Sequence, residues 1–258
     1  MSEIHLILAL ARNDFSYFFR TKWLMAVLLS LNLSDMLVVA LVYGKLMTFD
    51  YFQFFVPAVV VMGLFAASLD TGRRIWLAIR ENVVQYYLSL PISTKGLVLA
   101  YLLAGGLAAL VYSSSLLMIA LLVLPAHAIS TIFILLPFLF ILAMGLAGIA
   151  ASLAALASTH GEYFFAFQQI VQVTLLAIST VFYPIDTVRQ YLPSFLVDVA
   201  QMNPLSLATT AIREFVFQGS PIQPLFLLNL LLTSIPFAII GAAAYLAALR
   251  AIQMKGKL

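Results

Sequence analysis

The chain has 258 residues, of which 64% are hydrophobic and only 9% are charged. A soluble globular domain of this length does not need so much apolar surface, so the composition excludes that class and predicts an integral membrane protein. The sequence contains no cysteine, which excludes a disulfide framework, a thiolate catalyst and a zinc–thiolate site. The formal net charge is +3. Because the basic residues flank apolar segments, this charge indicates orientation in a membrane rather than binding to nucleic acid.

The N-terminal segment is amphipathic. On a helix, apolar side chains such as Ile7, Ala11 and Phe18 share one face, and Arg12 and Arg20 lie on the other. This pattern predicts that residues 1–22 form a helix lying in the cytoplasmic membrane interface. The simpler alternative is an N-terminal extension of the first membrane span.

Several segments are long and apolar enough to cross a bilayer, since a span needs roughly 20 mostly apolar residues. They lack the two-residue alternation of membrane β-barrel strands, so helices are expected. These six segments are residues 23–43, 52–69, 97–123, 131–157, 163–183 and 226–249. We therefore predict an all-α integral membrane fold with six transmembrane helices, in a single domain covering residues 1–258.

Orientation follows from the basic residues. If both termini are cytoplasmic, all of the 13 Lys and Arg residues except Lys45, Arg189 and Arg213 lie on the inner side. That bias is the one described by the positive-inside rule. We expect a multi-pass protein of the cell membrane with both termini in the cytoplasm.

Asp35 is the one ionisable residue deep in a predicted span. A central carboxylate costs roughly 2.5–3.5 kcal/mol on insertion scales, so this residue is a functional candidate. A structural hydrogen bond, for example to Asn32, explains it equally well. The three histidines are far apart and lack neighbours at ligand spacing, so no metal site is expected.

The fourth and fifth predicted spans carry small and polar side chains in helical register. Alanines recur at every fourth residue from Ala143 to Ala155, which predicts a packing face in the bundle interior or at a subunit interface. In the fifth span, Gln168, Gln172 and Ser179 lie roughly on one face. Polar side chains avoid lipid, so these either bond to neighbouring helices or line a polar path. Both alternatives stay open.

Residues 70–96 form the only sizeable cytoplasmic loop. Within it, residues 73–90 are amphipathic and are predicted to form a helix that ends at Pro91. One alternative is a loop helix that simply lies on lipid.

Residues 184–222 are too polar and too interrupted by proline to cross a membrane. They predict two short extracellular helices, with Asp186 and Ser194 as candidate N-caps of the first. Asn203 is the candidate N-cap of the second, with Pro204 at its first position.

The second of these helices is predicted to end before Gly219. A dozen helical residues reach only some 18 Å, whereas the hydrocarbon layer is roughly 30 Å thick. We therefore expect a re-entrant structure that folds against the outer membrane edge and closes an exit. The candidate gate residues are Asn203, Pro204, Ile212, Arg213 and Phe215.

An ordered set of residues before the last span resembles the extracellular region of type-2 ABC transporter permeases. The set comprises Tyr183, Pro184, Ile185, Asp186, Pro193, Asn203, Pro204, Leu205, Arg213 and Gly219. A second set resembles the coupling helix that seats in the ATPase subunit of that family. Its members are Glu81, Val84, Tyr87, Leu88, Pro91, Ser93, Thr94 and Lys95. The family often has Gly-Thr after the glutamate, and Asn82 and Val83 stand there instead.

The resemblance implies the permease subunit of an ATP-driven exporter. It implies ATPase coupling through Glu81, Val84, Tyr87, Leu88 and Pro91. It also favours the fifth-span residues Gln168, Gln172 and Ser179 as part of a substrate path, to which we add Asp35 as the one intramembrane acid. Hydrophobic drugs, lipids and lipid-linked glycans all fit the apolar spans.

The sequence contains no nucleotide-binding motif. No cofactor is therefore expected on this chain, and ATP and Mg²⁺ would bind to a partner ATPase present in two copies. A homodimer, or pairing with a similar permease, would complete the membrane part. The main alternative is an ATPase-independent channel or secondary transporter that uses Asp35 and the fifth-span glutamines. A weaker alternative is a membrane enzyme that acts on lipid.

Overall fold

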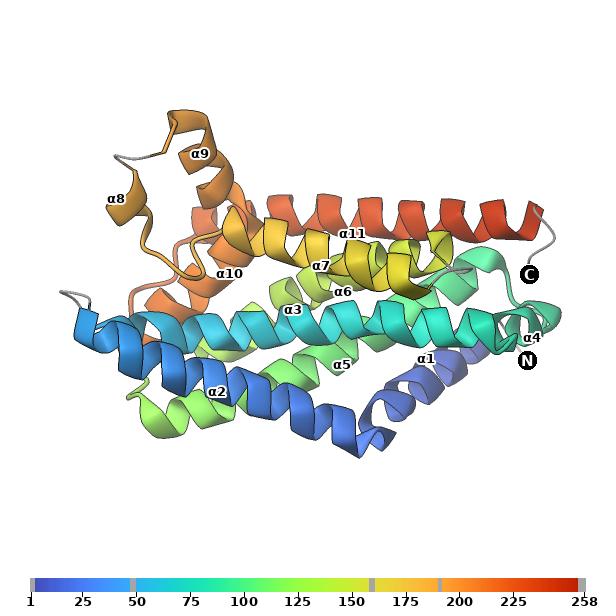
Figure 1. The fold of residues 1–258 in the computed structure, drawn as a ribbon, viewed down its shortest axis with the longest axis horizontal. Helices are drawn as coiled ribbons and strands as arrows, with labels where there is room; N and C mark the ends of the chain where they lie inside the picture. The colour runs from blue at the N-terminus through green and yellow to red at the C-terminus, as the bar shows by residue number, and fades with distance from the viewer. Residues whose placement is uncertain (1–2, 47–49, 158–160, 190–191, 255–258) are drawn as a thin grey trace.

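The computed structural model describes residues 3–46, 50–157, 161–189 and 192–254. This part of the chain is built from helices (Figure 1). Four of them are long and apolar enough to cross a membrane: α3 (Tyr51–Arg80), α5 (Thr94–Val123), α6 (Thr131–Leu156) and α11 (Pro224–Met254). The chain is thus an all-helical, multi-pass membrane protein.

The N-terminal segment forms two helices, α1 (Glu3–Arg20) and α2 (Lys22–Leu46). α1 and the described core of α2 are bent by 64° and would provide a fifth crossing if counted as one broken span. α1 lies along α5, and Ala11 is buried in that contact, whereas Ile4 and Leu8 remain exposed. Phe18 is buried next to Arg74 of α3. The Glu3 carboxylate accepts hydrogen bonds from the backbone and hydroxyl of Ser93, the N-cap of α5.

The core of the bundle consists of α3, α5, α6 and α11, and α6 and α11 have the most extensive contact. Glycines allow these two helices to approach closely. A Cβ atom on Gly241 would lie 2.5 Å from the Gly145 carbonyl oxygen and 3.1 Å from Gly148 Cα. The alanine stripe from Ala143 to Ala155 is completely buried, so this face belongs to the bundle interior.

Two predicted spans are not among these four helices. The predicted fifth span, residues 163–183, corresponds to α7 (Gly161–Ala177), which has only 17 residues. Such a helix is about 26 Å long, short of the hydrocarbon thickness, and its last predicted residues form turns instead. The predicted first span corresponds to α2, in which several side chains, including that of Asp35, lie outside the described residues. By length and composition, the described residues show four helices that could each cross a membrane, or five crossings if α1 and α2 form one broken span.

The predicted helix over residues 73–90 is wrong as one element. α3 continues to Arg80, and a new helix, α4, covers Val83–Ser89. Asn82 breaks the helix with a left-handed φ of 59°. Asparagine is among the few residues other than glycine that adopt this conformation readily.

Four short elements precede α11: α8 (Ile185–Val188), α9 (Ser194–Met202), α10 (Pro204–Ala211) and a π-helix, η1 (Ile212–Phe217). The N-caps predicted at Asp186 and Ser194 are wrong, because prolines 184 and 193 occupy these positions. The Asn203 cap and Pro204 at the first helical position are confirmed. Gly219 ends the segment with a φ of 69°.

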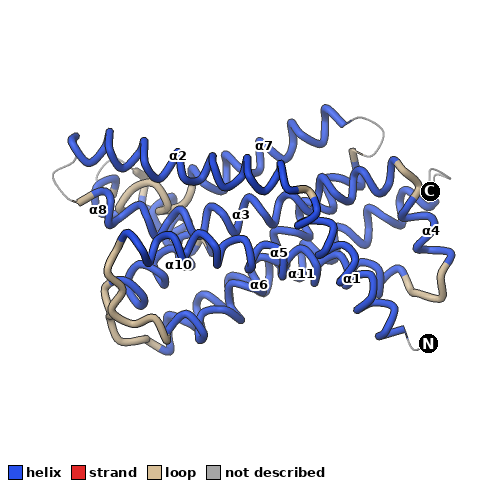
Figure 2. The backbone as a smooth tube through the Cα atoms, turned by 90° about the horizontal axis from the view of Figure 1, so that it is seen from below, coloured by secondary structure: helices blue, strands red, loops and turns tan. Residues whose placement is uncertain are grey.

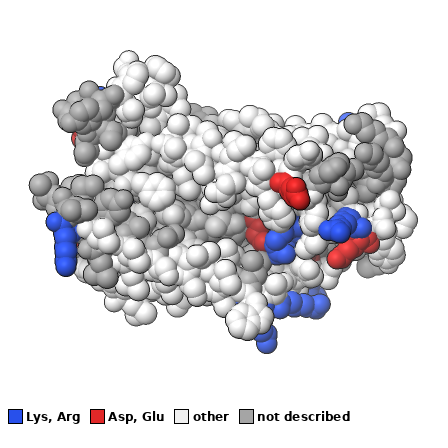
Figure 3. Space-filling view, viewed as in Figure 1, with Lys and Arg blue, Asp and Glu red and all other residues white. Residues whose placement is uncertain are grey.

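The short elements are segregated to opposite ends of the bundle. The start of α1, α4 and the end of α11 lie at one end, which we call the α4 end, and α8, α9 and α10 lie at the other, the α9 end (Figure 1). On the face shown in Figure 3, most charged side chains lie toward the α4 end, and the middle of the surface is uncharged. This distribution fits a protein whose middle is surrounded by lipid.

The close approach of α6 and α11 gives a first prediction. Gly241→Val should destabilise the protein by about 2 kcal/mol or more, because the added side chain overlaps the α6 backbone. Thermal unfolding of the detergent-solubilised chain measures this loss. Ala243→Val is the matched control, since Ala243 is an exposed residue of the same helix. Equal midpoints for both variants would contradict the described packing.

Candidate functional site

A cleft of about 300 Å³ lies between α2, α3 and α7. Figure 2 shows α2 and α7 along the same side of the molecule, with α3 beside them. The walls are largely apolar, and the polar groups are concentrated in a few positions on all three helices. The lining residues are Leu28, Leu31, Asn32, Met62, Phe65, Ala66, Asp70, Arg73, Phe165, Gln168, Gln172 and Leu176.

The polar groups of this cleft differ in how well they are satisfied. The Asn32 amide donates to the Leu28 carbonyl at 2.8 Å and to the Tyr112 hydroxyl at 3.0 Å. In contrast, Gln168 Oε1 is buried and has no hydrogen-bond partner within the described part of the chain. A buried acceptor without a partner costs about 1–3 kcal/mol. The cleft therefore offers an unused acceptor to a ligand that carries a hydrogen-bond donor.

A charge network adjoins the cleft toward the α4 end. Arg73 Nε donates to Asp70 Oδ1 at 2.6 Å. The other oxygen of Asp70 lies 3.4 Å from Nε of Arg74, whose side chain is almost fully buried. Arg74 also forms an ion pair with Asp14 of α1 and donates to Thr71 Oγ1 at 3.0 Å. Asp70 thus connects a cleft-lining ion pair with a contact between α1 and α3.

The structure brings together part of the predicted substrate path. Gln168 and Gln172 line the same cleft. Ser179 does not join them, because it is fully buried in the turn after α7 and its hydroxyl donates to the Leu176 carbonyl at 2.7 Å. The side chain of Asp35 lies outside the described residues.

Sequence reasoning missed Asp70 and Arg73 as cleft residues. They were assigned to a loop because the predicted span ended at residue 69, whereas the helix continues for another three turns. The spacing of Asp70 to Arg73 and Arg74 was the available signal, since residues three and four apart are neighbours on a helix.

The predicted coupling residues are unequally accessible. Glu81 and Pro91 are exposed at the α4 end. Val84 is 0% exposed and belongs to the core. Tyr87 and Leu88 pack against the same core, and the Tyr87 hydroxyl accepts a hydrogen bond from Asn13 at 3.0 Å.

Tyr86 is the residue of α4 that the sequence pattern did not single out. Its side chain is 63% exposed, and it lies beside the Tyr87 ring. The resemblance to the coupling helix implies Val84 and Leu88, which lie on the packed face, and does not include the outward residue Tyr86. The accessible surface of α4 is formed by Gln85, Tyr86 and Ser89, and Glu81 is exposed just before the helix, at the end of α3.

At the α9 end, Asn203 joins two helices. Its Oδ1 accepts from the Leu205 amide at 2.9 Å, which caps α10. Its amide nitrogen donates to the carbonyls of Leu175 and Ile178 at 3.0 and 2.9 Å, at the end of α7. One side chain thus satisfies backbone groups at the end of α7 and the start of α10.

Most of the remaining predicted gate residues are buried against the bundle. Pro204, Ile212 and Phe215 are buried, and Phe215 contacts Phe226 of α11 with the ring centroids 5.2 Å apart. Arg213 is half-buried and donates twice to the Phe54 carbonyl. The segment forms a packed cap over the α9 end of the bundle.

Replacing Asn203 tests this junction. Asn203→Ala should cost about 2–3 kcal/mol, because it removes a cap of about 1 kcal/mol and two hydrogen bonds of about 1 kcal/mol each. Asn203→Asp keeps the capping acceptor but loses both donors, so it should retain part of the stability. Thermal unfolding in detergent checks both, and exposed Asn229→Ala is the control. An Asn203→Ala protein as stable as this control would show that the junction contributes nothing.

The arrangement can bind an amphipathic molecule, with apolar walls for its body and amide and charged groups for its polar part. Among the described residues, no group of three or more His, Cys, Asp or Glu side chains is placed to hold a metal ion. No protein-family model matches this chain, and no curated protein matches it.

Proposed function

We propose that this chain is the permease subunit of a type-2 ABC exporter that moves a hydrophobic or amphipathic substrate, such as a drug, a lipid or a lipid-linked glycan, out of the cytoplasm or inner leaflet. In this proposal α2 and α7 complete six crossings, and the α4 end faces the cytoplasm. ATP and Mg²⁺ bind to a separate ATPase, present in two copies. A second copy of this chain, or a similar permease, completes the membrane part.

The observation that carries this proposal is α4. It is a short helix at the end of a 30-residue helix, held on one side by the core through Val84 and presenting Tyr86 on the other. A partner that binds Tyr86 and Glu81 would move α4, and with it the end of α3. Because α3 also carries Asp70 and Arg73, such a movement would reach the cleft.

The cleft supports the choice of substrate. Its walls combine leucine and phenylalanine side chains with two glutamines and an ion pair, as expected for a ligand with an apolar body and a polar group. The packed cap at the α9 end supports a closed exit. ATP binding would drive transport only through a difference in affinity between the inward-open and outward-open states.

Copurification tests the proposal. The tagged full chain is extracted from its native membranes, and the ATPase activity that accompanies it is measured. Tyr86→Ala should lower the recovered ATPase by about tenfold, because truncating a central interface aromatic commonly costs 1–2 kcal/mol or more. Glu81→Lys should act in the same direction.

Phe195→Ala is the matched control. Phe195 is an aromatic residue of α9 at the opposite end of the bundle, and it is also 63% exposed. This variant should recover as much ATPase as the wild type. If no ATPase accompanies the wild-type chain and purified chain alone transports substrate in vesicles, the ATPase-independent channel or secondary transporter replaces the proposal.

A further inference from the structure

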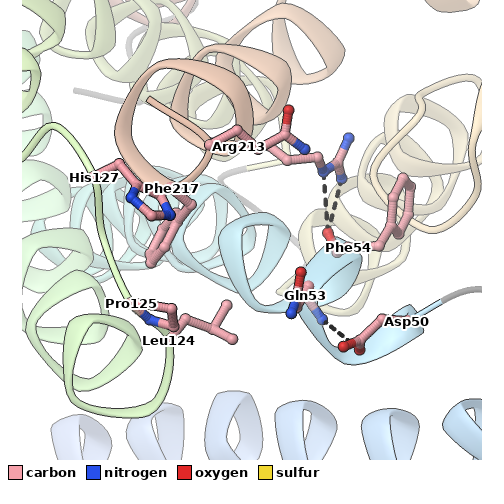
Figure 4. A pocket seen from close by; sticks show the side chains of 9 residues that line it. Asp50, Gln53, Phe54, Leu124, Pro125, His127, Arg213 and Phe217 are labelled. Atoms are coloured by element: carbon pink, nitrogen blue, oxygen red, sulfur yellow. Dashed lines mark hydrogen bonds between the residues drawn. The ribbon is translucent and has the colours of Figure 1, made fainter. Parts of the chain in front are cut away.

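A second cavity, of about 440 Å³, lies at the α9 end of the bundle. Three segments form it: the start of α3, the loop that follows α5, and the end of η1 (Figure 4). The loop is held in place because the His127 and Ala128 amides both donate to the Val216 carbonyl at 3.1 Å. Gly219 makes this approach possible, since a Cβ atom there would lie 2.7 Å from His127 Cβ. The cavity is thus bounded by fixed backbone.

Arg213 is the cation of this cavity. Its Nε and Nη2 donate to the Phe54 carbonyl at 3.1 and 3.0 Å, and its guanidinium carbon lies 3.8 Å from the centre of the Phe54 ring (Figure 4). Within the described residues, no carboxylate lies within ion-pair distance of Arg213. Burial lowers its pKa to about 10, so the guanidinium is still charged at neutral pH. The neighbouring carboxylate of Glu214 acts on this charge through Coulomb attraction, but among the described residues no carboxylate forms an ion pair with it.

Donors remain available around this charge. A guanidinium has five N–H donors, and the two bonds to Phe54 leave three. The amides of Gln53 and Gln218 and the imidazole of His127 line the same cavity and are exposed. Asp50 also lines the cavity, but its carboxylate caps α3 by accepting a hydrogen bond from the backbone N–H of Gln53 at 3.1 Å. The N-terminus of a helix carries a partial positive charge, which offsets the negative charge of the Asp50 carboxylate.

The π-helix positions these groups. The backbone N–H of Gln218 donates to the backbone carbonyl of Arg213, five residues back, at 3.0 Å. The wide turn buries Phe215, Val216 and Phe217 in succession while Arg213 and Gln218 face the cavity. Single π turns are frequent at functional sites.

We infer that this cavity binds a phosphate group, with Arg213 as its charged ligand and Gln53 and Gln218 as further donors. A planar guanidinium matches the oxygens of a phosphate. The cavity lies at the end of the spans, where lipid headgroups are found, and Leu124, Pro125 and Phe217 give it an apolar wall. A lipid headgroup and free phosphate share the required chemistry. The inference does not depend on a partner ATPase.

Lipid binding to the full chain in detergent tests this site by native mass spectrometry. Phosphatidylglycerol should bind with a measurable affinity, whereas diacylglycerol with the same acyl chains but no phosphate should not. Arg213→Gln should weaken phosphatidylglycerol binding at least about tenfold, because one charge-assisted contact of this kind corresponds to such a factor. Arg189→Gln is the matched control, since it removes a charge from an exposed residue at the same end.

Gln218→Glu keeps the test decisive if Arg213→Gln does not fold. Gln218 is exposed, and its structural hydrogen bond comes from the backbone, so the variant only adds a negative charge beside Arg213. It should weaken phosphatidylglycerol binding by a similar factor. Titration with inorganic phosphate separates the sources: thermal stabilisation by phosphate without phosphatidylglycerol binding assigns the site to a soluble anion. Equal binding of both lipids, wild-type affinity in both variants, or no response to either probe overturns the inference.

Discussion

The packing at the α4 end of this protein depends on one constraint, which is that the buried guanidinium of Arg74 needs acidic partners. The side chain of Arg74 is 1% exposed, and its acidic partners Asp14 and Asp70 are 13% and 6% exposed. A charge removed from water must be paired and hydrogen-bonded. Arg74 is paired with Asp70 on its own helix and with Asp14 of α1. Its Nη atoms donate to Asp14 and Thr71, whereas its buried Nε makes no hydrogen bond within the described residues. The Phe18 ring, 5.3 Å from the guanidinium carbon, covers the same group.

That constraint has consequences along the whole of α3. This helix has 30 residues and is about 45 Å long. It carries Phe54 at the α9 end, Asp70 and Arg73 at the cleft, and α4 just beyond its last residue. It is also the most buried of the four long helices: 72% of its apolar 18-residue stretch is buried inside the bundle, compared with 17% for α11. A displacement at either end of α3 therefore has to be absorbed by the core or passed along the helix.

The sequence predicts local structure correctly where a residue type is favoured in only one kind of backbone position. Asn203 followed by Pro204 predicted a helix start that forms as expected, because few other arrangements use that pair. Gly219 likewise marked the end of the segment. The alanine stripe predicted close packing, although only the structure assigns it to the bundle interior.

The hydrophobicity pattern gives wrong or ambiguous predictions where two different environments favour the same residue types. Hydrophobicity ended a predicted span at residue 69, because charged residues follow, yet the helix continues to Arg80 through paired charges. An apolar helix face does not distinguish packing on its own bundle from docking on another chain: Val84, which the resemblance implies as a coupling residue, is buried in the core. The cavity around Arg213 was not predicted at all, because it depends on segments distant in the sequence and on a π-helix.

The most direct measurement is a double-mutant cycle on Arg74 and Asp14, read from the free energy of unfolding in detergent. Arg74→Met leaves Asp14 buried without its partner, and Asp14→Leu leaves Arg74 with Asp70 alone. Removing one member of a buried ion pair costs about 3–5 kcal/mol. Replacing both residues should restore part of that loss, so the double variant should be more stable than the sum of the single effects predicts. Additive effects, or single variants as stable as the wild type, would contradict the role assigned to this buried charge.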